Sequence, residues 1–515
     1  MTRLTVSLIE PDLEATRRAA DRALGGGADL VELRIDHLQS IDVGSIGRLV
    51  DRLPPGRAIV TCRSRSQGGR YTDSESERIE VLARVASGRD VLVDLEFDTW
   101  QASEPVRQRI GGVLGGDLSR LILSDHDFEG RPASPGGRLA EIRQANPAGV
   151  AKLAWTGADA ADSLDALELM RSGGGRTIAV CMGQAGVASR VLAGKFGGFL
   201  TYCSLSTRTE AAPGQVDLAG MKHLYRWSHL GAATQVLGVV AWPVGHSLSP
   251  LVHNAALAEL GIDAVYVPLP IQPSYEAFAG FVQRARACAG LHLRGLSVTI
   301  PHKSHALRLA GEVERLAERI GAANTLIFDP ADADAAARAM NTDYAGALGA
   351  LVSGAGWRRE ELAERRCAVL GAGGAARAVV AGLADCGCDV TVYNRTEARA
   401  RALAEEFGCT WRPFEKRDRL DAEAVVNTTS VGMHPNVDES PLPADALRKG
   451  MVVFETIYNP LETLLLKQAK RAGCCVIDGV GMFVEQAALQ FEAWTGRSSP
   501  RELMRRVVVE RLAGR

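Results

Sequence analysis

The sequence predicts an α/β fold throughout: an N-terminal (β/α)8 TIM barrel, followed by a two-lobed α/β region that contains a Rossmann domain. Three observations support this fold class. The 515 residues exceed the roughly 100–200 of an ordinary single domain. Eight short apolar runs alternate with helix-like segments in the first part of the chain. Residues 366–380 show an apolar strand, a glycine-rich turn and the start of a helix.

The composition argues against several classes of protein. The 59 Lys and Arg residues are balanced by 61 Asp and Glu residues, and the net charge of −2 argues against a nucleic-acid binder that relies on positive charge. No apolar run approaches the roughly 20 residues that cross a bilayer. The ten cysteines show neither C-x-x-C nor metal-ligand spacing, so we expect no metal and a reducing, cytoplasmic setting.

Eight predicted strands form the barrel. Each run is short, apolar and rich in β-branched residues, and helix-like segments such as 12–24 and 158–171 separate the runs. The predicted strands are Leu4–Ile9, Leu30–Ile35, Ala58–Cys62, Val91–Leu95, Leu121–Leu123, Val150–Trp155, Thr177–Met182 and Phe199–Leu205.

Ionisable residues close several of these strands. Glu32, Arg34 and Asp36 share one face of the second strand, because strand side chains alternate with a period of two. A half-exposed edge strand is the alternative for one strand alone. Five successive strands, however, carry such groups towards their carboxyl ends, where a barrel keeps its active site. The others are Arg63, Asp94, Glu96, Asp125, His126, Asp127 and Lys152.

Lys152 and His126 are the strongest candidates for chemistry in the barrel. Lys152 has apolar neighbours on both sides, and desolvation favours a neutral amine, which is a nucleophile for a ketone or aldehyde. The alternative is an inward lysine paired with Glu32 or Asp94. His126 is a candidate proton shuttle, because an ordinary histidine titrates near neutrality, and the alternative is a structural histidine of the core.

A set of motifs follows these strands in order: Glu32-Leu-Arg34-Ile-Asp-His37, Thr-Cys-Arg63, Asp94-Leu-Glu96, Ser-Asp-His126-Asp-Phe, Lys152, Met182, Ser-Arg190 and Ala-Pro-Gly-Gln215. Together they resemble the type I 3-dehydroquinate dehydratases over residues 3–220. The resemblance implies that Lys152 forms a Schiff base with the ketone of the substrate. It also implies that His126 removes the proton next to the imine carbon and later protonates the departing hydroxyl.

The same resemblance assigns substrate contacts. It implies that Glu32, Arg34 and Arg63 hold hydroxyl groups of the substrate. Arg190, together with Gln215, would hold the carboxylate, a task suited to a guanidinium fork.

Two positions depart from the pattern of this family. Gln67 stands where the family usually has Glu near the catalytic histidine, so a hydrogen bond remains possible but the charge is lost. Ala211 stands where the family commonly has Ser. Neither change removes the lysine or the base, so we expect a working, though slower, dehydratase.

The glycine-rich turn predicts a dinucleotide site. It fits G-x-G-x-x-G/A, with Gly371 for the turn, Gly373 and Gly374 near the phosphates and Ala376 for helix packing. A turn without a ligand is the alternative. The next strand ends on Asn394-Arg395-Thr396 rather than on Asp or Glu, and Arg395 is suited to a 2′-phosphate, so the cofactor is predicted to be NADP(H).

The remaining motifs flank this turn, and each residue alone has an ordinary explanation as a cap, a solvated lysine or a turn. Ser249, for example, is expected to cap a helix with Pro250 at its first position. The motifs are Gly245-His-Ser247-Leu-Ser249-Pro250, Leu296-Ser-Val-Thr299-Ile-Pro301-His-Lys303, Asn324, Asn341-Thr-Asp343-Tyr344, Asn427-Thr-Thr-Ser-Val-Gly-Met433, Ile457-Tyr458-Asn-Pro460, Asp478-Gly479-Val-Gly481-Met482 and Gln486.

In combination they resemble the shikimate dehydrogenases, from Gln235 to the C-terminus. The resemblance implies that Lys303 and Asp343 form the polar catalytic pair, in which Lys303 protonates the developing alkoxide during hydride transfer. It also places Gly479 at the cofactor. The residues that it implies in substrate binding are Ser247, Ser249, Thr299, Asn324, Asp343 and Gln486.

The order of the two halves is that of plant-type bifunctional enzymes. We therefore expect a dehydratase barrel at 1–222, joined by a helical connection to a substrate-binding domain at 234–345. An NADP-binding Rossmann domain at 346–480 follows, and C-terminal helices at 481–515 return to the substrate domain. No transit-like leader precedes Leu4, so a bacterial cytoplasm is expected.

The predicted function is sequential catalysis in the shikimate pathway: 3-dehydroquinate to 3-dehydroshikimate, then NADPH-dependent reduction to shikimate. The alternatives are a catabolic quinate/shikimate enzyme and a non-catalytic ligand sensor on the same domains. The partners are small-molecule substrates, with neither nucleic acid nor membrane, and the sequence leaves the oligomeric state open.

Overall fold

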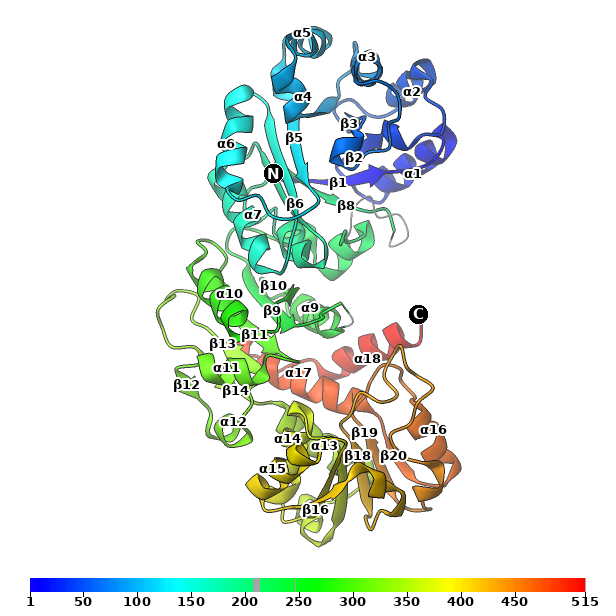
Figure 1. Cartoon of the computed structure of the whole chain (residues 1–515), viewed down its shortest axis with the longest axis vertical. Helices are drawn as coiled ribbons and strands as arrows, with labels where there is room; N and C mark the ends of the chain where they lie inside the picture. Colours follow the sequence, from blue (N-terminus) through cyan, green and yellow to red (C-terminus); the bar gives the residue numbers. More distant parts are fainter. Residues whose placement is uncertain (207–213, 246, 515) are drawn as a thin grey trace. The chain divides into compact units, whose positions relative to one another are not determined.

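The computed structural model describes residues 1–206, 214–245 and 247–514, and the chain divides into two compact units (Figure 1). The first unit comprises Met1–Val236, Pro243–Gly245 and Asp263–His292, and the second comprises Leu237–Trp242, His246–Ile262 and Leu293–Arg515. Among the described residues, no helix is long and apolar enough to cross a membrane.

Eight parallel strands form the sheet of the first unit, in the order β7-β6-β5-β4-β3-β2-β1-β8. Phe199, directly before β8, donates its backbone N–H to the carbonyl of Thr177 in β7 at 2.8 Å, which joins the two ends of the sheet. The predicted barrel is therefore confirmed, and β5 extends beyond its predicted end. The strands are β1 (Arg3–Leu8), β2 (Leu30–Arg34), β3 (Ala58–Thr61), β4 (Leu92–Glu96), β5 (Leu121–Asp127), β6 (Val150–Thr156), β7 (Thr177–Met182) and β8 (Leu200–Cys203).

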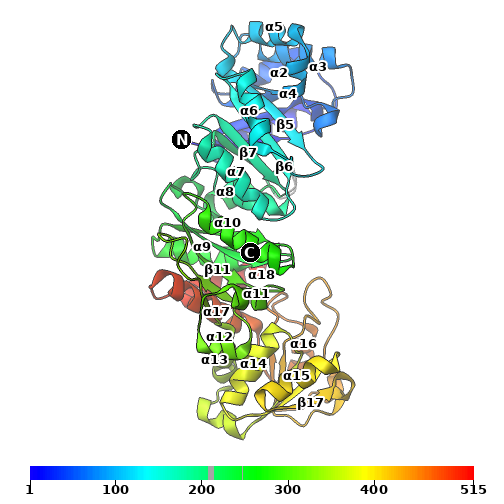
Figure 2. The same cartoon turned by 60° about the vertical axis from the view of Figure 1, so that its left-hand side comes forward.

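Helices follow the strands of the barrel (Figure 2). Asp12 caps the first of them and accepts a hydrogen bond from the N–H of Ala15 at 2.8 Å, as its short polar side chain favours. The predicted connecting helix at 217–233 is instead a π-helix at Gly220–Leu224 and a 3-10 turn at Trp227–His229. The helices are α1 (Leu13–Gly25), α2 (Val43–Val50), α3 (Glu75–Ala86), α4 (Phe97–Ala102), α5 (Glu104–Val113), α6 (Pro135–Ala145), α7 (Ala161–Ser172) and α8 (Val187–Val191).

The barrel interior changes from apolar to polar along the strands. One buried cluster contains Leu30, Ile59, Leu92, Ile122, Val150, Ile178 and Leu200, which come from seven of the eight strands. Because side chains alternate along a strand, the same face carries Glu32, Asp94 and Lys152 two residues later. The interior thus becomes more polar towards the carboxyl ends of the strands, where these three ionisable groups lie.

A second sheet has the strand order β10-β9-β11-β13-β14-β12. Helix α9 begins at Ser249, with Leu248 at the cap position and no side-chain capping bond, so the predicted Ser249 cap is wrong by one residue. The hydroxyl of Ser247 instead accepts the N–H of Ser249 at 3.3 Å. The elements are β9 (Gln235–Ala241), α9 (Ser249–Glu259), β10 (Ala264–Pro270), α10 (Tyr275–Ala287), β11 (Leu293–Val298), α11 (Lys303–Leu309), β12 (Glu312–Val313), α12 (Arg315–Ile320), β13 (Thr325–Ile327) and β14 (Arg338–Met340).

The third sheet has the order β17-β16-β15-β18-β19-β20, all parallel, which is the strand order of a Rossmann domain. Helices α13 to α15 pack on one face and α16 on the other. The elements are α13 (Asp343–Ala355), β15 (Arg366–Leu370), α14 (Gly374–Asp385), β16 (Asp389–Asn394), α15 (Glu397–Phe407), β17 (Thr410–Pro413), β18 (Ala424–Asn427), β19 (Val452–Glu455), α16 (Leu464–Arg471), β20 (Cys475–Ile477), α17 (Gly479–Thr495) and α18 (Arg501–Leu512).

Candidate active sites

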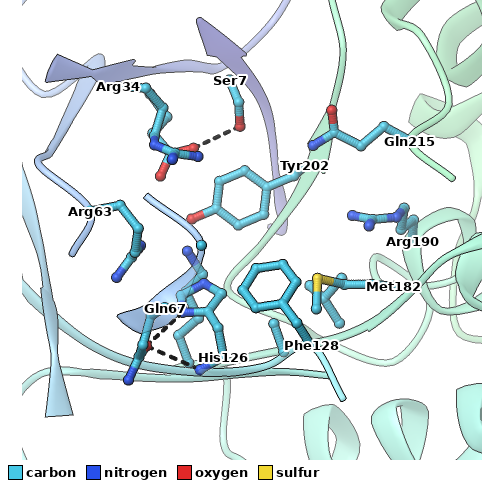
Figure 3. A pocket seen from close by; sticks show the side chains of 15 residues that line it. Ser7, Arg34, Arg63, Gln67, His126, Phe128, Met182, Arg190, Tyr202 and Gln215 are labelled. Atoms are coloured by element: carbon cyan, nitrogen blue, oxygen red, sulfur yellow. Dashed lines mark hydrogen bonds between the residues drawn. The ribbon is translucent and has the colours of Figure 1, made fainter. Parts of the chain in front are cut away.

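A pocket of about 600 Å³, including its open mouth, lies at the carboxyl end of the barrel strands (Figure 3). All seven residues predicted for the first site line it: Glu32, Arg34, Arg63, His126, Lys152, Arg190 and Gln215. Sequence reasoning missed Ser7, Phe128 and Tyr202, which also line it. Ser7 and Tyr202 lie on barrel strands, and the period-two pattern of those strands is the signal that could have found them.

Lys152 points into this pocket from β6 and is 5% exposed. Its Nζ lies 2.8 Å from Oδ2 of Asp94 and 4.6 Å from the centre of the Tyr202 ring. Of the two partners considered from sequence, Asp94 rather than Glu32 is therefore the one that Lys152 contacts. Burial by itself would raise the pKa of the Asp94 carboxyl, but the charges of Arg63 and Lys152 hold that pKa well below its usual range.

His126 lies beside Gln67, as the sequence suggested. Its Nδ1 is 3.0 Å from Oε1 of Gln67, and its backbone N–H donates to the same oxygen at 3.1 Å. Since an amide oxygen only accepts, Nδ1 carries the proton and Nε2 keeps its lone pair. Burial, together with the positive charges of Arg63 and Lys152, holds the pKa of His126 well below 6.5. The imidazole is therefore neutral near pH 7 and able to accept a proton.

The remaining charged groups fix one another in place. Arg63 pairs with Asp94 at 2.7 Å and with Glu96 at 3.1 Å. Arg34 pairs with Asp36 at 2.8 Å. Each guanidinium on this side of the pocket is therefore positioned by a carboxylate of the protein itself.

Glu32, Arg190 and Gln215 complete the predicted set. Glu32 accepts hydrogen bonds from Ser7 at 2.7 Å and Thr61 at 2.9 Å. Arg190 is buried in the short helix α8, and the close-up shows it with Gln215 on the far side of the Tyr202 ring from Arg34 and Arg63 (Figure 3). Ala211, the second departure from the family pattern, lies outside the described residues.

A second pocket lies wholly in the second unit. It is lined by all the residues predicted for substrate and catalysis there: Ser247, Ser249, Thr299, Lys303, Asn324, Asp343 and Gln486. Lys303 opens α11 and Asp343 opens α13, and Nζ of Lys303 lies 2.5 Å from Oδ2 of Asp343. Sequence reasoning missed Ser297 and Gln490, whose side chains are joined by a 2.8 Å hydrogen bond across β11 and α17.

Asn324 organises the loop that carries Asp343. Its amide nitrogen donates to Oγ1 of Thr342 at 2.9 Å, and its amide oxygen accepts the N–H of Thr342 at 2.9 Å. Asn341 accepts the N–H of Asp343 at 3.0 Å. The backbone N–H groups of Thr342 and Asp343, which lead into α13, are thus each held by a buried amide, and this positions Asp343 beside Lys303.

The glycine-rich turn has the shape that a dinucleotide phosphate needs. Gly371 has φ +115°, and a Cβ there would lie 2.6 Å from Oγ1 of Thr428, so only glycine fits. Gly373 is the cap residue of α14, and Gly374 opens that helix, whose free N–H groups favour an anion. A Cβ on Gly374 would lie 3.2 Å from Lys303, so the turn abuts the second pocket.

The end of β16 is open and carries no carboxylate. Nδ2 of Asn394 donates to the carbonyl of Thr396 at 2.9 Å, and Arg395 between them is exposed. Ala376 is fully buried inside α14, as predicted for helix packing. Gly479 opens α17, where a Cβ would lie 2.5 Å from the carbonyl oxygen of Ile457, so backbone packing already explains this glycine.

The fold and the two pockets define a two-site α/β enzyme, with an amine and an imidazole in a barrel and a lysine–aspartate pair beside a dinucleotide-binding turn. Comparisons agree. The type I 3-dehydroquinase family matches residues 4–232, the shikimate dehydrogenase substrate binding domain 239–326, the shikimate/quinate 5-dehydrogenase family 355–453 and the shikimate 5′-dehydrogenase C-terminal domain 479–509.

Individual relatives cover the same regions. The chloroplastic bifunctional 3-dehydroquinate dehydratase/shikimate dehydrogenase of Arabidopsis thaliana is 35% identical over 93% of this chain and 79% of its own length. The shikimate dehydrogenase (NADP(+)) of Methanopyrus kandleri is 43% identical over 55% of this chain and 97% of its own length. A crystal structure of shikimate dehydrogenase with NADP+ is 36% identical, with a TM-score of 0.50, over 55% of this chain and 97% of that one. The chain belongs to the family of bifunctional 3-dehydroquinate dehydratase/shikimate dehydrogenases.

Proposed function

We propose that this chain carries out two successive steps of the shikimate pathway. The barrel dehydrates 3-dehydroquinate to 3-dehydroshikimate, and the second unit reduces 3-dehydroshikimate to shikimate with NADPH. The observation that carries the proposal is the meeting of Lys152 and His126 in one barrel pocket, on a chain that also holds Lys303 and Asp343 beside a dinucleotide-binding turn.

In the first reaction Lys152 supplies the amine. Lys152, which Asp94 holds in place at 2.8 Å, gives up one proton, and its nitrogen attacks the ketone carbon. One proton then leaves with the departing hydroxyl as water, so that a protonated imine remains. Nε2 of His126 then removes the proton from the carbon next to the imine carbon, and the electron pair of that C–H bond moves into the imine to form an enamine. The pair returns to expel the hydroxyl, to which His126 gives its proton. Water finally hydrolyses the conjugated imine and frees Lys152.

The Tyr202 ring separates two sides of the barrel pocket (Figure 3), and each side contacts a different part of the substrate. Arg190 and Gln215 hold the carboxylate on one side, where a guanidinium and an amide offer several donors. Glu32, Arg34 and Arg63 face the hydroxyls on the other side. The ion pairs of Arg34 with Asp36 and of Arg63 with Asp94 support this role, because side chains fixed in advance lose little entropy when the ligand binds.

In the second reaction the protein supplies a proton and orientation. Bound NADPH provides the hydride that reaches the ketone carbon. Lys303 holds a proton at the carbonyl oxygen, and Asp343 keeps its ammonium group directed there, which stabilises the developing alkoxide. The amides of Asn324 and Gln486 contact the substrate, as do the hydroxyl groups of Ser247, Ser249 and Thr299.

Residues of the Rossmann sheet hold the cofactor. The turn at Gly371, Gly373 and Gly374 cradles the pyrophosphate, with Ala376 packing the helix behind it. The exposed end of β16 receives the 2′-phosphate through Asn394, Arg395 and Thr396, because a guanidinium is present and no carboxylate repels the phosphate. Gly479, at the start of α17, also contributes to the cofactor site.

We also retain the predicted domains: 1–222, 234–345, 346–480 and 481–515. Helix α17 supports the return of the C-terminal segment, since Nε1 of Trp494 donates to the carbonyl of Leu326 in β13 at 3.0 Å. The cytoplasm remains the predicted location. A catabolic quinate enzyme and a ligand sensor remain the alternatives.

One assay tests the proposal. Purified protein is mixed with 3-dehydroquinate, and the absorbance of the conjugated product is followed before and after NADPH is added. We expect the product absorbance to rise first, and NADPH to be consumed only after it is added. The rate of this reduction should be far higher than the rate at which the protein oxidises quinate with NADP+. A wild-type protein that forms no conjugated product would contradict the dehydratase assignment, and preferred oxidation of quinate would favour the catabolic alternative.

A further inference from the structure

Tyr202 presents a buried polar atom that the mechanism does not use. It lies on β8 with 5% of its surface exposed, and it lines the barrel pocket. Within the part of the chain that the structure describes, its hydroxyl has no hydrogen-bond partner. An unsatisfied buried hydroxyl destabilises a fold, and because this one lines the pocket, a ligand there can supply the missing partner.

The position of the ring separates two roles of this side chain. Its face packs against Nζ of Lys152, at 4.6 Å from the ring centre, a contact that a phenylalanine would also make. The hydroxyl is a separate feature, because it points towards the side of the pocket where Arg34 and Arg63 lie (Figure 3). The ring contact therefore explains an aromatic residue here but leaves the hydroxyl unexplained.

The surroundings of the hydroxyl indicate which kind of group it meets. Burial, reinforced by the negative charges of Glu32 and Asp94, raises the pKa of Tyr202 well above 10, so the phenol keeps its proton and acts as a donor. Arg34 and Arg63 on that side are already paired with Asp36 and Asp94, so this side of the pocket carries no excess positive charge to attract an anion. A neutral hydroxyl of a ligand fits both, because it can accept from Tyr202 and donate to Glu32.

We propose that the hydroxyl of Tyr202 binds a ring hydroxyl of the substrate, on the end of the molecule away from the carboxylate. This inference rests on the proposed dehydratase function. In 3-dehydroquinate the hydroxyl that leaves is attached to the carbon that bears the carboxylate, and Arg190 and Gln215 lie on the opposite side of the Tyr202 ring (Figure 3). The hydroxyl that meets Tyr202 is therefore one that the product retains. Tyr202 thus contributes to binding of substrate and product alike, and not to the elimination itself.

The test is Tyr202→Phe, which removes the hydroxyl and keeps the ring against Lys152. We expect KM for 3-dehydroquinate to rise about fivefold to twentyfold, as for loss of one hydrogen bond in a buried site. The inhibition constant of 3-dehydroshikimate should rise by a similar factor, while kcat changes less than about twofold. The melting temperature of the ligand-free variant should not fall, because an unsatisfied group has been removed.

Two controls separate this role from damage to the fold. Tyr225→Phe removes another buried phenolic hydroxyl of the same unit, outside the residues that line the pocket, and should leave KM unchanged. NADPH-dependent reduction of 3-dehydroshikimate by the Tyr202→Phe chain is an internal control and should equal that of wild type. An active wild type whose Tyr202→Phe variant keeps its KM and inhibition constant would overturn the inference. A variant with lower kcat and unchanged KM would overturn it too, by placing the phenol in the chemistry. An inactive wild type would instead count against the proposed function.

Discussion

Replacing Gln67 with Glu should raise the pKa of His126, the proposed base. Gln67 contacts Nδ1 of His126 at 3.0 Å through its amide oxygen, so a carboxylate at the same place puts a negative charge beside the ring. At present burial and the charges of Arg63 and Lys152 keep the pKa of His126 well below 6.5. The new charge opposes both effects because it favours the imidazolium form.

The structure sets the size of the effect. Two unit charges about 4 Å apart interact by about 4 kcal/mol at the effective dielectric of a protein site, which corresponds to about 3 pKa units. Part of this is lost, since Nε2 of Gln67 donates to Asp125 at 3.2 Å and the substitution replaces that contact with a repulsion. Arg138 lies 2.6 Å from the other oxygen of Asp125 and offsets some of the repulsion. We therefore expect the pKa of His126 to rise by about 1–2 units.

The pH profile of kcat/KM for dehydration measures this shift. His126 must be neutral to accept a proton, so its pKa sets the acid limb of the profile in the free enzyme. In Gln67→Glu the acid limb should move to higher pH by the same 1–2 units. Gln67→Met is the matched control: it removes the hydrogen bond without adding charge and should lower the rate with no upward movement of the limb. An acid limb of Gln67→Glu that stays in place or moves to lower pH would refute the reasoning.

Four further substitutions have defined outcomes. Lys152→Ala should lower the rate of dehydration at least 1,000-fold and abolish the covalent adduct that borohydride traps with the substrate. The rate of NADPH-dependent reduction should stay within about twofold of the wild-type rate. A borohydride adduct on another residue would refute the assignment. Lys303→Ala should lower kcat for reduction at least 100-fold with unchanged NADPH affinity in a fluorescence titration, and normal turnover would show that the proton comes from another group. Arg395→Ala should raise KM for NADPH about tenfold or more and leave KM for NADH unchanged, whereas equal changes would exclude a 2′-phosphate contact. Burial raises the pKa of Glu455 to about 7 from 4.5, so the free energy of unfolding falls by about 3 kcal/mol as the pH rises from 4.5 to 8. Glu455→Gln should remove this fall, as measured by urea unfolding at a series of pH values. Equal pH dependence of the unfolding free energy in wild type and variant would contradict this prediction.

Local patterns were enough to find the strands and many of the side chains that line the two candidate sites. Glu32 and Arg34 alternate along β2, and a period of two is a property of any strand, so their common face could be predicted without a partner strand. The turn at Gly371 could be predicted in the same way. Its backbone has a positive φ, which glycine adopts more readily than other residues, so the sequence itself marks the position. These features depend on neighbours in sequence.

Partners that are distant in sequence were not predictable in the same way. Glu32 and Asp94 were equal candidates for Lys152, since all three project into the barrel. The stagger of the closed sheet, which no single strand encodes, brings Asp94 within 2.8 Å. Gln490 of α17 likewise meets Asn324 only after α17 packs on β13, with its Nε2 2.8 Å from the backbone carbonyl oxygen of Asn324.

The near-neutral charge of the chain agrees with how the barrel handles an anionic substrate. Arg34, Arg63 and Lys152 each contact a carboxylate at 2.7–2.8 Å, so these cations are largely neutralised by the protein itself and do not make the pocket a general anion trap. Arg63 and Lys152 also act on His126 through their charges, which keep its imidazole neutral, while their shared partner Asp94 limits that effect. Recognition of the carboxylate can then depend on the direction of Arg190 rather than on overall charge. In the proposed function, specificity for the substrate carboxylate then comes from the placement of Arg190, and a strongly basic surface would add attraction without selectivity.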